Sequence, residues 1–335
     1  MLGKCRVFAF TALSAVAYCQ LALGQATPAT ILVIDVENQV LYRGDVSDVS
    51  KLATDPNITT ASPPKNFEEA QAIGDIVAVN GRPARGMRLR DLRTFNTSRT
   101  GATPGTAIAD VGSRFGITVD AYEILDSDGN AIGSIMVSGL DFGTPPPGAP
   151  SMQASANLVI VGGTGAFLGA RGQAGHSATG ARAASMAEDP ARRRLLGGAR
   201  LQAVLHVIPM FRPEIVVTSG GPAVTHSSDF TPVTASKPAS AGEILSLFMT
   251  GLGPTRPGVD PGKPFPASPP AVVNSPVDVT VNGKSAEVTA AVGYPGSVDG
   301  YQVNFRVPTD TAKGTANIQV SAAWIAGSAV NIVIQ

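Results

Sequence analysis

Short runs of alternating apolar and polar residues make up most of this 335-residue chain, and long helical periodicity is almost absent. Alternation with a period of two is typical of a β-strand with one buried face. Together with short apolar runs, it predicts strands over 30–42, 76–79, 87–95, 115–125, 132–142, 158–161 and 201–208. The 37 glycines and 26 prolines supply turns between such strands. The pattern therefore predicts an all-β fold.

Local signals place two turns and one helix. Asn80-Gly81 is a strong hairpin signal, and the polar segment 126–130 predicts the turn between strands 115–125 and 132–142. Segment 126–130 superficially resembles a calcium loop, but Val137 stands where the bidentate glutamate belongs, so no calcium is expected. Asn66, followed three residues later by Glu69, forms a capping box and predicts a short helix over 66–73.

A glycine cluster follows the apolar run at 158–161. Gly162 and Gly165 fit a dinucleotide-binding spacing, but the third glycine, Gly169, comes one residue late, and no acidic residue ends a second strand nearby. We therefore expect no nucleotide cofactor. We expect instead an irregular turn in which Gly163 or Gly165 has a positive φ or lies too close to a neighbour for a Cβ.

The segment GGTGAFLGARGQA, residues 162–174, resembles the signature hairpin of the allene oxide cyclase and dirigent barrels. The resemblance implies an antiparallel β-barrel over 25–212, preceded by an N-terminal extension, with the glycines at a corner between strands and Phe167 plugging the barrel end. Barrels of this kind act mainly by holding a small molecule in a folded pose. Their pocket residues have no match that can be carried over to this sequence.

The pattern changes near Arg212, beyond which proline and glycine separate short strands every eight to twelve residues, as in a β-sandwich. The segments VDVTVNG, at 277–283, and YQVNFRV, at 301–307, resemble the immunoglobulin-like C-terminal domain of exported acidobacterial proteins, the Solibacter-type domain. The resemblance implies an accessory or spacer domain over 213–335 with no catalytic role. We expect two separate cores, hinged near 209–224.

The N-terminus has the features of an export signal. Lys4 and Arg6 precede a moderately apolar stretch, and small residues at 22 and 24 suit a cleavage site. This predicts a signal peptide over 1–24 and a secreted or extracytoplasmic protein. A lipoprotein would use Cys19, but the preceding residue is a large tyrosine. Both cysteines lie inside the signal, so the mature chain would have no disulfides.

Charge and motif content exclude several partners. Removal of the two signal-peptide cations from 25 basic residues leaves 23 against 25 acidic ones, a formal charge of −2, which gives no support for binding nucleic acid or an anionic membrane. No segment after the signal is apolar enough for a membrane-spanning helix. The three histidines stand far apart without a ligand motif, so no metal is expected. Arg88, Arg90 and Arg93, with Asp91, are interpreted as a solvated strand face.

One carboxylate is the candidate for chemistry. If Phe115, Ile117 and Val119 face the barrel interior, Glu123 shares their parity and faces inward as well. A carboxylate in a barrel is costly unless it is paired or functional. Glu123 is thus the candidate catalytic residue. The alternative is that Glu123 lies at the open end, solvated or paired with Arg114 or Arg171, the candidate ligand-binding residues.

Two functional hypotheses follow. The first is an exported, non-catalytic protein, binding a small apolar ligand in the barrel or associating with a surface. The second is an exported cyclase or isomerase that acts on a small apolar substrate in the same barrel. The second hypothesis requires a charged group inside the barrel.

Overall fold

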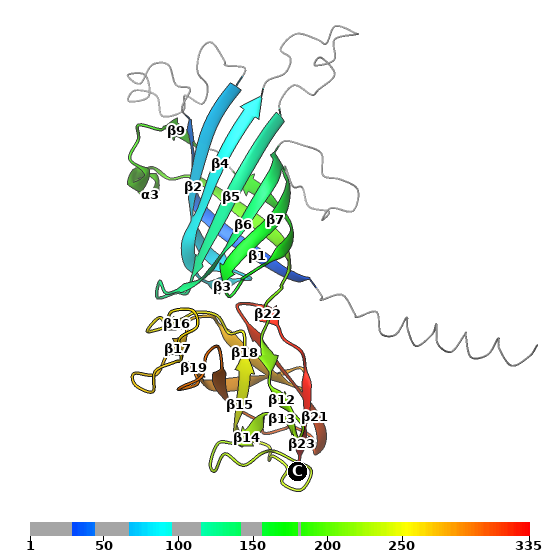
Figure 1. The fold of residues 1–335 in the computed structure, drawn as a ribbon. Helices are drawn as coiled ribbons and strands as arrows, with labels where there is room; N and C mark the ends of the chain where they lie inside the picture. The colour runs from blue at the N-terminus through cyan, green and yellow to red at the C-terminus, as the bar shows by residue number, and fades with distance from the viewer. Residues whose placement is uncertain (1–28, 44–66, 96–114, 142–155, 180–181) are drawn as a thin grey trace, which may run out of the picture.

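The computed structural model describes residues 29–43, 67–95, 115–141, 156–179 and 182–335. The predicted signal peptide, 1–24, and Arg114 lie outside these residues. The described residues form two β units that follow one another along the chain (Figure 1).

The first unit is a closed antiparallel barrel of eight strands, and it confirms the all-β prediction. Strand β1 pairs with both β2 and β10, and this double pairing closes the sheet. The barrel strands are β1 (Thr30–Arg43), β2 (Phe67–Val79), β4 (Arg85–Phe95), β5 (Phe115–Leu125), β6 (Ala131–Asp141), β7 (Ala156–Gly165), β8 (Arg171–Thr179) and β10 (Ala199–Ile208).

Shorter elements are attached to the barrel wall. Strand β3 (Arg82–Pro83) pairs with β2, and β9 (Ala183–Ser185) runs parallel to the end of β1. A 3-10 turn (Pro190–Arg192) leads into the four-residue helix α3 (Arg193–Leu196). This insertion covers the outward residues Val40 and Tyr42 of β1, which pack with Ala184.

The predicted helix over 66–73 is wrong, because its described residues belong to β2. Ala70 and Ala72 are buried, whereas Glu69 and Gln71 are exposed, which is the alternation of a strand. Strand β2 pairs along its length with β1 and β4. Two rows of inter-strand hydrogen bonds outweigh the local capping signal.

The predicted turns are confirmed. Asn80 and Gly81 both have positive φ, 49° and 74°, and join β2 to β3. At the β5–β6 turn, the Asp126 carboxylate accepts hydrogen bonds from the backbone N–H groups of Asp128 and Asn130. This carboxylate rigidifies the turn from within.

The glycine corner joins β7 to β8 as predicted. Gly165 has φ +59°, and a Cβ on Gly163 would lie 2.3 Å from the carbonyl oxygen of Phe167. Phe167 is only 1% exposed and packs into the barrel core. The corner therefore requires small residues, and it seats the phenylalanine that closes this end of the barrel.

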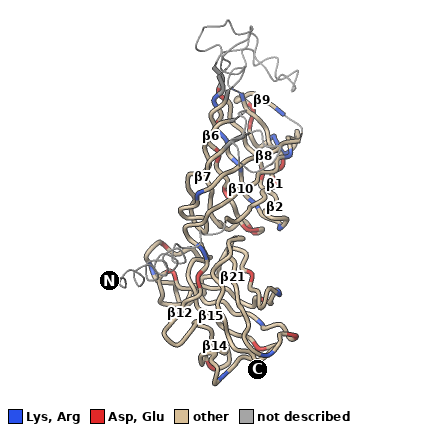
Figure 2. Tube along the Cα trace, turned by 90° about the vertical axis from the view of Figure 1, so that its right-hand side faces the viewer, with Lys and Arg blue, Asp and Glu red and all other residues tan. Residues whose placement is uncertain are grey.

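The second unit is built around an eleven-stranded sheet, which is nearly closed. Its core is a separate cluster of buried residues drawn from 215–334. Acidic and basic residues are interspersed along both units (Figure 2). The strands of the sheet are β11 (Glu214–Ile215), β14 (Val224–His226), β15 (Ile244–Thr250), β16 (Thr255–Arg256), β17 (Val272–Val273), β18 (Val277–Val281), β19 (Lys284–Gly293), β20 (Tyr301–Arg306), β21 (Gly314–Ala322), β22 (Ile325–Ala326) and β23 (Val330–Ile334); β12 (Val217–Thr218) and β13 (Gly221–Pro222) form a separate hairpin.

The second unit contacts the closed end of the barrel. Ala323 in its β21–β22 turn and Ile325 at the start of β22 are buried in the barrel's core cluster, with Trp324 packed against it. Around this contact, the Asn274 side chain donates to the Ala131 carbonyl oxygen at 2.9 Å. The two units are therefore joined by packing as well as by the connecting segment.

Candidate functional site

A cluster of charged side chains lies inside the barrel on β4 and β5. On β4 the inward positions are Arg88, Arg90 and Leu92, and all three residues are buried. The residues opposite them on β5 are Tyr122, Asp120 and Thr118 respectively, also buried. Arg90 therefore faces Asp120 directly across the two strands.

Arg88 and Asp120 form a fully buried ion pair, with both side chains 0% exposed. The Arg88 guanidinium donates through Nε, at 3.1 Å, and through Nη2 to the same Asp120 oxygen. Its Nη1 donates to the Gln39 side-chain oxygen. The guanidinium carbon also lies 5.8 Å from the centre of the Tyr122 ring, within the range of a cation–π contact.

Arg90 extends the cluster toward the opposite wall of the barrel. Its Nε donates to the Thr118 hydroxyl at 3.0 Å and lies 3.5 Å from Asp120 Oδ1. Its Nη1 lies 3.4 Å from Nε2 of His176, which comes from β8. Burial acts to raise the pKa of Asp120, but the Arg88 and Arg90 cations outweigh it and lower that pKa below its usual value. Asp120 is therefore ionised.

His176 is neutral, and its protonation can be assigned. Burial, together with the charges of Arg88 and Arg90, lowers its pKa to about 3. A guanidinium can only donate hydrogen bonds, so Nε2 accepts from Arg90 and the single ring proton sits on Nδ1. This Nδ1–H is buried and has no hydrogen-bond partner among the described residues.

Small residues on β2 lie in register with the two arginines, and a Cβ on Gly74 would lie 2.5 Å from Cγ1 of Val36 on β1. Gly74 pairs with Arg88, and Ala72 pairs with Arg90. Towards the β2–β3 turn the interior is apolar, with Ile34, Ile124 and Ile135 fully buried. The barrel thus has an apolar closed end, and a charged zone nearer the end where β1 and β4 finish.

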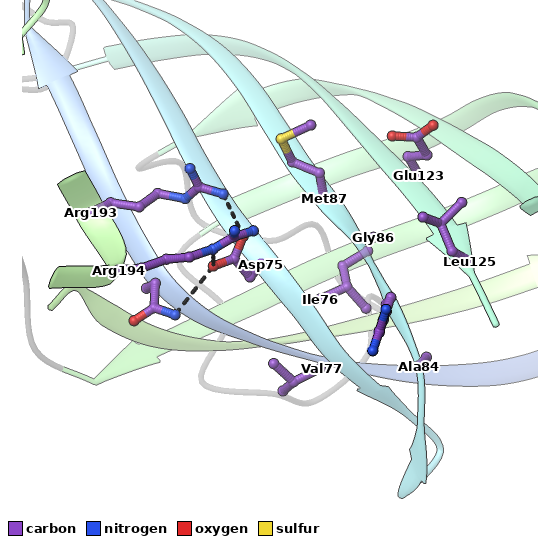
Figure 3. A pocket seen from close by; sticks show the side chains of 12 residues that line it. Asp75, Ile76, Val77, Ala84, Gly86, Met87, Glu123, Leu125, Arg193 and Arg194 are labelled. Carbon is purple, nitrogen blue, oxygen red and sulfur yellow. Dashed lines mark hydrogen bonds and ion pairs between the residues drawn. The ribbon is translucent and has the colours of Figure 1, made fainter. Parts of the chain in front are cut away.

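The predicted site residue Glu123 is not in the barrel interior. Ile117 and Val119 are each 45% exposed, while Thr118 and Asp120 are buried, so the assigned inward parity of β5 is wrong. Glu123 is exposed on the outer wall and lines a groove there (Figure 3). The β5 side chains that point into the barrel include those of Thr118 and Asp120, polar residues that the predicted parity placed on the outside.

Arg171, the other predicted site residue that the structure describes, forms its hydrogen bonds at the glycine corner and not with Glu123. Arg171 is exposed and donates from Nη1 to the carbonyl oxygens of Val161 and Ala170, at 2.7 and 2.9 Å, so it covers the glycine corner. Arg114 lies outside the described residues. The interpretation of the β4 arginines as a solvated face is correct for Arg93 and wrong for Arg88 and Arg90.

A signal for the interior cluster was present in the sequence. Thr118, Asp120 and Tyr122 have a period of two, as do Arg88 and Arg90. Pairing the two strands brings the opposite charges into register. Only the pairing of β5 with β4 shows that the polar face of β5, and not its apolar face, lies inside the barrel.

Comparison with protein-family models and with characterised proteins finds no match to this chain. Within the described ranges, no helix is long and apolar enough to cross a membrane. Those same ranges contain no group of three or more histidine, cysteine or acidic residues that could hold a metal ion.

Proposed function

We propose that this is an exported, non-catalytic binding protein that holds a small ligand in the charged zone of the barrel interior. The observation that carries the proposal is the Nδ1–H of His176, a buried donor with no partner among the described residues. A buried donor without an acceptor costs about 1–3 kcal/mol. A ligand that brings an oxygen to this position removes that cost.

The chemistry of the wall defines the ligand. His176 presents an N–H donor beside the Arg88 and Arg90 cations, and Asp120 already accepts from Arg88. Leu92 and Leu158 add apolar surface to the same interior. The ligand is therefore a small molecule with an apolar body and at least one strong acceptor oxygen, such as a carboxylate or sulfonate.

A cyclase or isomerase is the alternative for the same barrel, and it requires an acid or base that contacts the substrate. Glu123 cannot take this role from the outer wall. Asp120 is held as an ion pair with Arg88, and the low pKa of His176 makes it a weak base. These three observations favour binding over catalysis.

The test uses the mature chain, 25–335, and the fluorescent probe 8-anilinonaphthalene-1-sulfonate, which combines an apolar body with sulfonate oxygens. We expect saturable binding of one probe per chain. His176→Leu removes the donor and should weaken binding at least tenfold, whereas His176→Asn keeps an amide N–H near the Nδ1 position and should retain most of the affinity.

Gln173→Ala, on the exposed face of the same strand, is the matched control and should bind like the parent. Circular dichroism establishes that each variant is folded. Absence of saturable binding by the folded parent, or equal affinity in His176→Leu, would refute the proposal.

A further inference from the structure

A groove of about 630 Å³ runs across the outer wall of the barrel, separate from the interior cluster. Asp75 on β2, Met87 on β4 and Glu123 on β5 are directly in register and cross it as one row. Arg85 and Leu125 pair with each other in the same wall. Figure 3 shows Arg193 and Arg194 at the Asp75 end and Glu123 at the other end, with Met87 between them.

The Asp75 end of the groove is basic. Arg194 donates to Asp75 through Nε and Nη2, both at 2.9 Å, and Arg193 donates through Nη2. One carboxylate thus faces two guanidinium groups. Nε of Arg193, a residue only 7% exposed, has no acceptor among the described residues. This end has spare N–H donors and an excess of positive charge.

Two further charges line the groove without a counter-charge in the described part of the chain. Arg85 and Glu123 are both exposed, and neither forms an ion pair with a described residue. The groove floor between the charged ends includes Val77, Met87 and Leu125. The groove lining is therefore cationic at the Asp75 end and anionic at Glu123, with apolar side chains and Arg85 between the two ends.

We propose that this groove binds a short apolar peptide with free termini, its carboxylate at the arginine end and its ammonium group at Glu123. Charge complementarity favours a zwitterion over a simple anion, because Glu123 repels a second negative charge and attracts an amine. The apolar floor accepts the side chains between the two termini. The proposal is independent of ligand binding in the barrel interior.

The sheet geometry sets the length of the peptide. Neighbouring strands lie about 4.7–4.9 Å apart, so the backbones at Asp75 and Glu123, two strands apart, are separated by about 9–10 Å. An extended peptide spans about 3.3–3.6 Å per residue. Three residues therefore match the distance between the two charged ends.

The experiment measures binding of Ala-Leu-Ala to the mature chain by isothermal titration calorimetry. We expect saturable binding, and at least fivefold weaker binding of the N-acetylated and of the C-amidated peptide. Glu123→Gln should weaken binding of the free peptide at least fivefold and leave the N-acetylated peptide unaffected. Arg194→Gln, at the carboxylate end, should likewise weaken binding of the free peptide at least fivefold and leave the C-amidated peptide unaffected.

Arg93→Gln and Glu69→Gln are the matched controls, because these exposed residues lie in register on the same two outer strands, β4 and β2, outside the groove lining. Both should bind the tripeptide like the parent. His176→Leu should also bind it normally, which separates this site from the interior one. Absence of binding, equal binding of the blocked peptides, or equal losses in the control variants would overturn the proposal.

Discussion

Replacing His176 tests whether the barrel encloses the charged cluster in water-free surroundings. Its pKa falls from 6.5 to about 3 because of burial and the Arg88 and Arg90 cations. Between these two pH values the unfolded chain takes up a proton that the folded barrel does not. The free energy of unfolding therefore falls as the pH is lowered through this window.

The size of the effect follows from the shift. One pKa unit corresponds to about 1.4 kcal/mol, so His176 alone should cost about 2–3 kcal/mol between pH 6.5 and 4.5. Ordinary aspartates and glutamates begin to gain protons near the lower end of this range, so the histidine contribution is taken as the difference between the parent and a variant that shares all of its carboxylates. His176→Asn carries no titrating group and should lose this part of the pH dependence.

The assay is urea unfolding at a series of pH values, monitored by the fluorescence of Trp324. It is the single tryptophan of the chain, and it packs against the barrel core. Gln173→Ala, at an exposed position on the same strand as His176, is the control and should keep the slope of the parent. If His176→Asn and the parent show the same dependence from pH 6.5 to 4.5, the histidine is not held neutral in the barrel and the reasoning fails.

Three substitutions test other parts of the structure by urea unfolding at neutral pH. Asp120→Asn leaves Arg88 buried without its counter-charge and should cost about 3–5 kcal/mol, whereas Glu123→Gln, outward on the same strand, should change stability by less than about 0.5 kcal/mol. Gly163→Val should cost about 1–3 kcal/mol, because its Cβ would lie 2.3 Å from a backbone oxygen. Burial acts to raise the pKa of Asp75, but its arginine and amide partners outweigh burial and lower the pKa to about 2. Asp75→Asn should therefore lower the free energy of unfolding by about 2–3 kcal/mol. The parent should lose the same contribution as the pH falls from about 4 to 2, because the Asp75 carboxylate is then protonated. Equal stability of the Asp120 and Glu123 variants, of the glycine variant and the parent, or of the Asp75 variant and the parent would contradict the corresponding assignment.

Local chemistry was sufficient to predict many of the barrel strands and turns. Asn80-Gly81 specifies its hairpin because both residues tolerate positive φ. The glycine corner was predictable for the same reason. The helix prediction from Asn66 failed because the capping signal describes only one turn of chain, whereas pairing of β2 with β1 and β4 depends on strands far away in the sequence.

The inner face of β5 could not be chosen from its own sequence. Alternation shows that Ile117, Val119 and Glu123 share one face, but it does not show which face lies inside. The rule that apolar residues point inward gave the wrong answer here, because the interior holds an ion pair. The deciding information lies on β4, whose Arg90 pairs with Asp120.

The position of the charged cluster itself supports a role beyond stability. Replacing a buried ion pair with well-packed apolar residues is often neutral, or stabilising by about 1–4 kcal/mol. The closed end shows that this barrel accommodates an apolar interior, with Ile34, Ile124 and Ile135 fully buried. Polar residues therefore fill the other zone at some cost to stability. A ligand that accepts a hydrogen bond from His176 provides a physical reason for that cost, because it uses the donors that an apolar interior would lack.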